Sequence, residues 1–436
     1  MIAIISIICT MTGILLAIYY ANKQKINEYY LRKRVFVGDG FGYADSPYLA
    51  GKQAAQEAKK KCGGKPTFGL VFVSAKYEDI EKVVKGINEE FKGVPWIGCT
   101  SYKEINKSGV LDKSVVCIAL RSSFISVGVG IGENIRSAPT ESGEISILKA
   151  LLDVEKKSKK NKQWPYKTLI MFPSGIISTK DKPCVEQDII NGILKYINDE
   201  WIVVGGSAAG ISLNDDNWQF INGRVYENAV VCAVIYSKVR IKVAVGLGYK
   251  ETGDKVKATK TVQNIIHELN DNQACNEFAK LTKTDLLKND LLKVVIKYSL
   301  AIIDSDDQFC WCVPPIYIRK DGGIVVTRKI DEGTYLAIVK SNKELLKKGC
   351  EDAVEKAIDG IDQRDIVAFL LFPCMLYRFG LSNEECDNSI REISSFIGEN
   401  IPLAGFYTFG EQGRNKSGKF GQLNQSVAAL VITREF

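Results

Sequence analysis

The sequence has very little histidine: His267 is the only one in the chain, and no Cys-x-x-Cys pair occurs. A zinc site of the usual kind needs four His, Cys or acidic ligands held together, which these residues do not supply. A serine or cysteine nucleophile needs a nearby base, most often histidine, so a catalytic triad has no support. The phrase "GGSAAG" at 205–210 also departs from a nucleophile elbow, because Ala209 replaces its second glycine.

Disulfide spacing is missing as well, although the chain has twelve cysteines. They stand singly in apolar runs, as Cys117 does in "SVVCIAL" and Cys232 in "AVVCAVIY", and the only close pair is Cys310 and Cys312. Scattered thiols in a long chain are typical of a reduced, cytosolic protein. Free cysteine is also an ordinary small core residue, which is the alternative interpretation of each one.

No stripe of interleaved aromatic and basic residues is present, so we expect no nucleic-acid partner. The net charge of +7 comes from 58 Lys and Arg against 51 Asp and Glu. The basic run "VEKKSKKNKQ" at 154–163 is typical of a solvated loop. The phrase "GVGIGENI" at 128–135 has closely spaced glycines but lacks the dinucleotide-binding fingerprint.

The first twenty residues, "MIAIISIICTMTGILLAIYY", contain no charge at all. As a helix, this length is enough to cross a bilayer core of about 30 Å. A cleaved signal peptide carries positive charge before its apolar core, whereas here the basic residues come only afterwards. We predict a transmembrane anchor over residues 1–22, a basic juxtamembrane linker over 23–35 and a cytoplasmic body. A buried core helix and an uncleaved export signal are the alternatives.

With 436 residues, the chain is too long for one ordinary core. One pattern occurs three times, from Thr67, from Lys167 and from Asp365: a strand, a helix, a second strand, a loop and a third strand. Two strands joined by a helix lie parallel, with a right-handed crossover. The sequence therefore predicts an α/β fold with mixed β-sheets, built from repeated strand-helix-strand-strand units with helices packed on the sheets.

Small and hydroxyl-bearing residues recur where the strands of each repeat end. Ligands bind beyond the carboxyl ends of the strands in open α/β sheets. Glycine there lets backbone N–H groups approach a ligand closely, although it also serves simply to make a tight turn. The candidate ligand-binding residues at these ends are Ser74, Ser174 and Cys374 after the first strands, and Cys99, Thr100, Gly206, Ser207 and Tyr407 after the second strands.

Several phrases connect the chain to a known family. In chain order they are "IGCTSYKEI", "SVVCIAL", "FPSG", "VVGGSAAG", "QFINGRVYENAVVCAV", "VAVGLGY", "KTVQNIIHELNDNQACNEF", "RDIVAFLLFPCMLYRFG", "PLAGFYTFGEQG" and "LNQSVAALVI". With these motifs the chain resembles the FIST family over roughly residues 36–436. The resemblance implies two main domains, a FIST N-terminal domain at 36–285 and a FIST C-terminal domain at 286–436. It also implies a sensory, small-ligand-binding module of signalling proteins, with amino acids as the suggested ligands.

The resemblance adds two acidic candidates to the site. Glu104 and Glu411 match the glutamate of two glycine-containing corners, although Lys103 stands where the family usually has glycine. Two carboxylates that face one pocket could hold a ligand ammonium or act as an acid/base pair. The alternative is that each glutamate only accepts hydrogen bonds from its own loop.

A Cys-x3-Arg pattern of the family is matched by Cys374 and Arg378, although Pro373 replaces the more usual serine. Arg378 could clamp a ligand carboxylate through two hydrogen bonds, or form a structural ion pair. Some members of the family bind haem, and His267 is the only imidazole available here as an axial ligand. We expect no cofactor, with haem as the exception to test.

Three kinds of function are compatible with these residues. The first is a membrane-anchored cytoplasmic sensor that binds a small polar ligand and, since the sequence shows no output domain, passes its signal to a partner protein. The second is an enzyme in which Cys374 or the pair Glu104 and Glu411 does chemistry in the same pocket. The third is a protein–protein scaffold without a ligand, and a haem-binding gas sensor is a further variant of the first.

Overall fold

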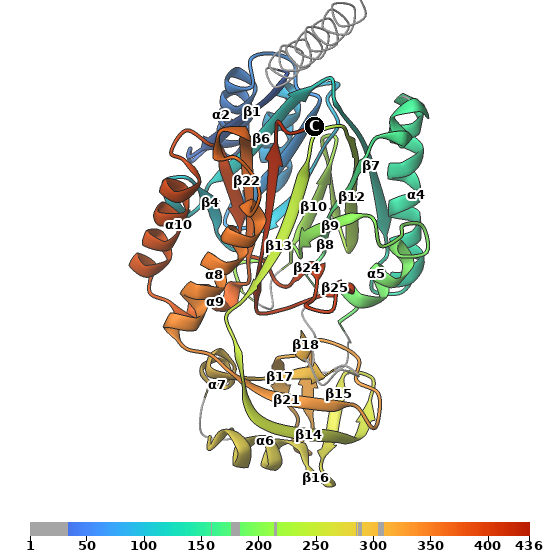
Figure 1. Cartoon of the computed structure of the whole chain (residues 1–436), viewed down its shortest axis with the longest axis vertical. Coiled ribbons are helices and arrows are strands. Elements are labelled where there is room, and N and C mark those ends of the chain that lie inside the picture. The colour runs from blue at the N-terminus through green and yellow to red at the C-terminus, as the bar shows by residue number, and fades with distance from the viewer. Residues whose placement is uncertain are drawn as a thin grey trace, which may run out of the picture.

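The computed structural model describes residues 34–436 apart from 158, 176–183, 213–215, 285, 287–289 and 304–308. Its largest part is a body made of three six-stranded sheets, to which a fourth sheet is attached (Figure 1). Each sheet of the body is built on one segment of the chain. We call these segments unit 1 (35–122), unit 2 (125–237) and unit 3 (241–433).

The three units share the order of their strands and main helices, and they differ in short 3₁₀ turns, one short helix and an inserted sheet. Unit 1 consists of β1 (Val35–Gly42), α2 (Pro47–Lys61), β2 (Phe68–Ser74), α3 (Ile80–Glu90), β3 (Trp96–Ser101), β4 (Glu104–Asn106), β5 (Gly109–Leu111) and β6 (Val115–Ser122). Unit 2 consists of β7 (Ile125–Glu133), α4 (Pro139–Lys157), the short 3₁₀ turn η1 (Lys159–Gln163), β8 (Tyr166–Pro173), α5 (Glu186–Ile193), β9 (Ile202–Gly206), β10 (Trp218–Ile221), β11 (Arg224–Glu227) and β12 (Ala229–Ser237).

Unit 3 is longer because a separate sheet is inserted after its first strand. Its own elements are β13 (Ile241–Leu247), α8 (Lys343–Ile358), the 3₁₀ turn η2 (Gln363–Asp365), β22 (Ile366–Pro373), α9 (Met375–Gly380), α10 (Asn383–Ile397), β23 (Leu403–Phe406), β24 (Glu411–Arg414), β25 (Phe420–Gln422) and β26 (Ser426–Thr433). The inserted sheet and its helices are β14 (Lys250–Val262), β15 (Ile265–Leu269), β16 (Asn272–Gln273), α6 (Ala274–Thr282), α7 (Leu291–Lys297), β17 (Tyr298–Ile303), β18 (Phe309–Cys312), β19 (Pro315–Ile318), β20 (Ile324–Val326) and β21 (Tyr335–Lys340). In Figure 1 it lies below the body.

The strand order is the same in the three sheets of the body: β1-β6-β2-β3 in unit 1, β7-β12-β8-β9 in unit 2 and β13-β26-β22-β23 in unit 3. Each sheet is then completed by a hairpin from another unit. Unit 2 gives β10–β11 to unit 1, unit 3 gives β24–β25 to unit 2, and unit 1 gives β4–β5 to unit 3. The units therefore exchange hairpins in a closed cycle.

The body has an aromatic centre with the same threefold character. Phe72, Phe172 and Phe372 lie at matching positions of β2, β8 and β22. Their ring centroids are 5.6 Å apart for the first two, 5.9 Å for Phe72 and Phe372, and 6.0 Å for Phe172 and Phe372. Phe406 of β23 packs against all three rings. All four side chains are buried, so the three sheets share one core.

Sequence analysis missed the first strand and helix of each unit. The closely spaced glycines that lack a dinucleotide fingerprint lie in β7, where they let α4 cross the sheet at short range. A Cβ atom on Gly130 would come 2.2 Å from the carbonyl oxygen of Ser146. Gly40 stands in the same relation to Ala54 in unit 1. The glycine spacing is therefore a packing feature of the strand rather than a phosphate-binding loop.

The prediction of a transmembrane helix is corrected. Residues 1–22, on which it was placed, lie outside the part that the structure describes. Within that part, no helix is long and apolar enough to cross a membrane. Helix α4 has 19 residues but carries acidic and basic side chains along its length. The described fold is mixed α/β without a membrane-spanning helix, and the membrane-anchored location drawn from that helix is withdrawn with it.

The predicted division of the chain at residue 285 stays a prediction. In the sequence, that position lies between β14 and β21, two strands of the inserted sheet that pair with each other.

Candidate functional site

The three residues that follow the first predicted strands occupy equivalent positions. Ser74, Ser174 and Cys374 lie at the carboxyl ends of β2, β8 and β22, and all three are buried. Each donates its backbone N–H to the residue that stands at the start of the last strand of its unit. The acceptors are the carbonyl oxygens of Ser114 at 2.9 Å, Ala229 at 2.8 Å and Ser426 at 2.9 Å. The strand ends are thus closed by the units' own backbone.

The residues after the second strands are also buried, and exchanged hairpins cover them. The hydroxyl of Thr100 accepts from the backbone N–H of Trp218 at 2.9 Å, and the hydroxyl of Ser207 accepts from Gln412 Nε2 at 2.9 Å. Cys99, Gly206 and Phe406 pair with hairpin residues at matching register positions. These ends are therefore packed against other units in the described structure.

Glu104 is fully buried within unit 1. Its carboxyl accepts hydrogen bonds from Ser101 Oγ at 2.6 Å, from Ser114 Oγ at 2.7 Å and from Ser114 N at 3.2 Å. Burial raises the pKa of Glu104 to about 7, and these hydrogen bonds oppose the rise. The side chain holds the loop after β3 to the start of β6.

Glu411 repeats this arrangement in unit 3. Its carboxyl accepts from Ser426 Oγ at 2.9 Å, from Ser426 N at 3.0 Å and from the hydroxyl of Thr408. Burial raises the pKa of Glu411 to about 7 as well. Because Glu104 and Glu411 have separate partners, the structure shows two matched corners rather than one pair of facing carboxyls.

Gln219 is the third member of this set, and sequence analysis missed it. Gln219 is opposite Cys99 in its sheet, just as Glu104 is opposite Phe406 and Glu411 is opposite Gly206. Its Oε1 accepts from the backbone N–H at the start of β12 at 3.2 Å. A signal was available, because Gln219 precedes the cysteine in "AVVCAVIY" by the same number of residues as Glu104 precedes the cysteine in "SVVCIAL".

Cys374 lies beside Glu411 and donates its thiol to that carboxyl. Burial raises the pKa of the Cys374 thiol well above its ordinary value, and the charge of Glu411 adds to this. A cysteine nucleophile reacts as the thiolate, so this environment disfavours the reactive form. The neighbouring hydroxyls of Tyr249 and Tyr377 are buried and have no hydrogen-bond partner among the described residues.

Arg378 lies on α9, just beyond the end of β22, and its side chain is partly buried. Its positive charge opposes the rise that burial causes in the pKa of Tyr407 and of Cys386, so the guanidinium is near both groups. No carboxylate within the described residues forms an ion pair with it. Lys103, by contrast, is paired with Asp112 at 2.9 Å.

His267 lies away from the strand ends of the body. It belongs to β15 of the inserted sheet, with its Nδ1 3.8 Å from Asp321 Oδ2. Within the described ranges, no group of three His, Cys, Asp or Glu side chains is arranged to hold a metal ion.

Family comparisons agree with the motifs. The FIST N domain matches residues 67–272 and the FIST C domain matches residues 274–414. The chain belongs to the FIST family. FIST domains are associated with signal transduction and ligand sensing.

More distant similarities were also found. An uncharacterised protein of Methanocaldococcus jannaschii, MJ1623, is 25% identical over 172 residues, which cover 36% of this chain and 33% of that protein. The match thus spans about a third of the relative's length. A solved cyanuric acid hydrolase aligns with 92% of this chain and 100% of its own at 10% identity and a TM-score of 0.39. The same enzyme from A. caulinodans aligns with 92% of this chain and 99% of its own, at 8% identity and a TM-score of 0.36.

Proposed function

We propose that this protein is a sensory module that binds a small ligand bearing a carboxylate, such as an amino acid, next to Arg378. The observation that carries the proposal is that Arg378, a partly buried residue, has no carboxylate partner among the described residues. The planar fork of a guanidinium matches a carboxylate through two hydrogen bonds. Its place beyond the end of β22 fits the general position of ligands in α/β folds.

The ligand's amino group needs a different partner from the one the sequence suggested. The lone pairs of Glu104 and Glu411 already accept hydrogen bonds from serine, threonine and backbone donors. An ammonium would have to displace those donors in a fully buried corner, at a cost of about 1–3 kcal/mol for each polar group left unpaired. The carboxylate contact with Arg378 therefore carries more of the proposed recognition.

Ligand binding would act by favouring one conformation of the protein over another, and a partner protein would detect the change. A ligand shifts such an equilibrium only by its difference in affinity for the two states. Arg378 is suited to this role because α9 and α10 connect β22 to β23, so a ligand that draws the guanidinium inward also acts on the helices that follow.

The experiment is a thermal-shift screen of the full chain against the twenty amino acids, related small carboxylic acids and haem, followed by calorimetry of any hit. A ligand that binds the folded state raises the melting temperature by mass action. We expect a carboxylate-bearing hit that is lost in Arg378→Ala. Arg364→Ala is the matched control, because Arg364 is exposed and pairs with Asp362 in its own turn.

Two results would contradict the proposal. A hit that keeps its affinity in Arg378→Ala would place the ligand elsewhere. A haem hit that disappears in His267→Ala, with no carboxylate hit, would make the protein a haem-binding sensor instead.

A further inference from the structure

Glycines bring the two helices that cover the outside of unit 1 into close contact. A Cβ atom on Gly51 of α2 would lie 2.2 Å from the carbonyl oxygen of Val83 on α3. A Cβ atom on Gly86 of α3 would lie 2.1 Å from the carbonyl oxygen of Tyr48 on α2. Neither position has room for a side chain, so the two helix backbones touch.

Unit 2 uses the same device. A Cβ atom on Gly143 of α4 would lie 2.1 Å from the carbonyl oxygen of Ile189, and one on Gly192 of α5 would lie 2.0 Å from that of Thr140. The helix pairs of units 1 and 2 are therefore closed by a reciprocal pair of glycines.

Unit 3 lacks both glycines. Gly246 of β13 lies against Gly349 of α8, just as Gly132 of β7 lies against Ser142 of α4. Gly349 and Ser142 are therefore equivalent. The next residue in each helix is Cys350 in unit 3 and Gly143 in unit 2. Helix α10 contains no glycine, so nothing in it matches Gly86 of α3 or Gly192 of α5. Unit 3 therefore lacks the reciprocal pair of glycines that brings the helices of the other two units into backbone contact.

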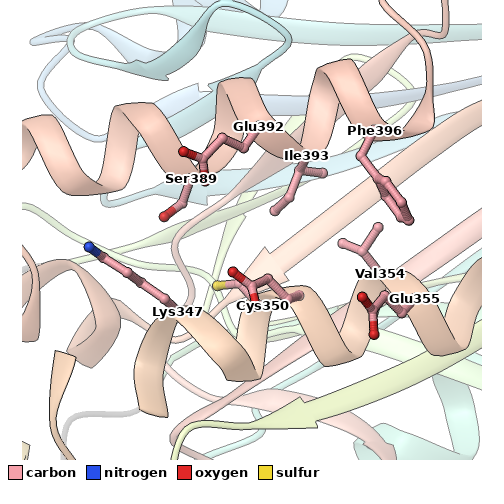
Figure 2. A pocket seen from close by; sticks show the side chains of 9 residues that line it. Lys347, Cys350, Val354, Glu355, Ser389, Glu392, Ile393 and Phe396 are labelled. Atoms are coloured by element: carbon pink, nitrogen blue, oxygen red, sulfur yellow. The ribbon is translucent and has the colours of Figure 1, made fainter. Parts of the chain in front are cut away.

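A groove lies between α8 and α10 (Figure 2). Its lining residues are Lys347, Cys350, Glu351, Val354, Glu355, Ser389, Glu392, Ile393 and Phe396. Its floor is apolar, because Val354 and Ile393 are buried. Phe396 at one end is 52% exposed, an unusual position for a phenylalanine on a helix that is otherwise packed on a sheet.

The rim of the groove is acidic. Glu351 and Glu355 of α8 and Glu392 of α10 all line it, and none of the three forms an ion pair within the described residues. The one basic residue of the lining, Lys347, has its charge opposed by Glu385 at 3.3 Å. A partner for this groove must therefore bring apolar side chains for the floor and positive charge for the rim.

We propose that the groove between α8 and α10 binds an amphipathic helix of a partner protein, with an apolar stripe flanked by Lys or Arg. Such helices commonly dock into apolar grooves through side chains at positions i, i+3 or i+4, and i+7. The inference names the chemistry of the partner that the proposed sensory function requires, and so rests on it. It can be tested without the small ligand, so the two proposals can fail separately.

The probe is a labelled synthetic helical peptide with leucines on one face and lysines beside them, titrated into the full chain. Two control peptides have the same composition in scrambled order, or glutamate in place of lysine. We expect binding of the first peptide alone, weakened by salt. Affinity should fall about tenfold in Glu392→Lys and in Phe396→Ala, a loss of about 1.4 kcal/mol each. It should persist in Glu344→Lys, an exposed position of α8 outside the groove.

Several outcomes would overturn the proposal. Equal binding of the basic and the acidic peptide would show that charge complementarity plays no part. Unchanged affinity in both groove variants would place the peptide elsewhere, and no binding at all would reject an amphipathic helix as the occupant. A dimer that Phe396→Ala dissociates in sedimentation would show that a second copy of this chain covers the groove.

Discussion

At the scale of single residues, the buried carboxyls of Glu104 and Glu411 make stability depend on pH. Burial raises both pKa values from 4.5 to about 7. The unfolded chain releases these protons above about pH 4.5, whereas the folded protein keeps them up to about pH 7. The free energy of unfolding therefore falls as pH rises through this interval, by about 3 kcal/mol at most for each group.

Glu104→Gln and Glu411→Gln should fold and lose this dependence. Gln219 already occupies the equivalent corner of unit 2, so a neutral amide fits the geometry. The measurement is urea unfolding between pH 5 and pH 8. The free energy of unfolding of the double variant should change less with pH than that of the unaltered protein. Between pH 5 and pH 8, the double variant should therefore lose less stability.

Glu385 provides a control of opposite sign. Hydrogen bonds from the Ser382 N–H and from Lys343 lower the pKa of Glu385 from 4.5 to about 2. The ionised Glu385 therefore stabilises the folded protein above about pH 4.5, the pKa in the unfolded chain, and this stabilisation is lost as pH falls toward 2. Glu385→Gln should change only the acid limb of the profile. Identical slopes between pH 5 and pH 8 in the double variant and the unaltered protein would show that the buried glutamates do not cause them.

At the scale of elements, helix pairs that touch through glycine should not tolerate a larger residue at the glycine position. Gly143→Ala would force a methyl group to 2.1 Å from a backbone oxygen, and we expect a loss of about 3 kcal/mol in the free energy of unfolding. Cys350→Ala changes the equivalent position of unit 3, where the helices are already apart, and should cost less. Denaturation curves measure both, and a cost at Cys350 as large as that at Gly143 would contradict the equivalence.

Local patterns made the middle of each unit predictable. A β-branched run, an amphipathic helix and a second run before a glycine identified β2, α3 and β3 and their counterparts in the other units. The first strands were missed because glycines at alternate positions of β7 removed the side chains on which a strand pattern depends. The corner of Gln219 was missed because Gln219 lies 14 residues after the glycine that ends the strand run, whereas Glu104 and Glu411 lie 6 residues after theirs. Its matching spacing is the one to the cysteine of the strand that follows it.

Arg378 likewise was predictable from the sequence in one respect and not in another. The Cys-x3-Arg motif identified Arg378 as a candidate. Whether an Asp or Glu side chain lies close enough to pair with it depends on the tertiary structure.

At the scale of the whole molecule, the ring contacts of Phe72, Phe172 and Phe372 connect the three sheets. Each truncation to alanine should cost about 3–5 kcal/mol, with similar values in the three units because the positions are equivalent. Two truncations together should cost less than their sum, since the rings touch one another. Thermal unfolding of the single and double variants provides the test. A much larger loss of stability for one phenylalanine than for the other two would show that the three positions are similar in geometry but not in energy.

The closed exchange of hairpins also predicts how the chain behaves when it is divided. Fragments 34–240 and 241–436 each leave sheet edges without their hairpins, because unit 1 completes unit 3 and unit 3 completes unit 2. Neither fragment should show a cooperative transition alone, and mixing them should restore one. Independent folding of either fragment, seen by circular dichroism, would contradict this.

The same cycle implies a particular distribution of local openings. A unit that opens by itself must take its hairpin from the next sheet and release the hairpin that it received, so opening spreads around the ring of units. Native-state hydrogen exchange should then give one shared opening free energy for amides of β3, β9 and β23. The inserted sheet exchanges no hairpin with the body, so its amides should show a separate and lower opening free energy.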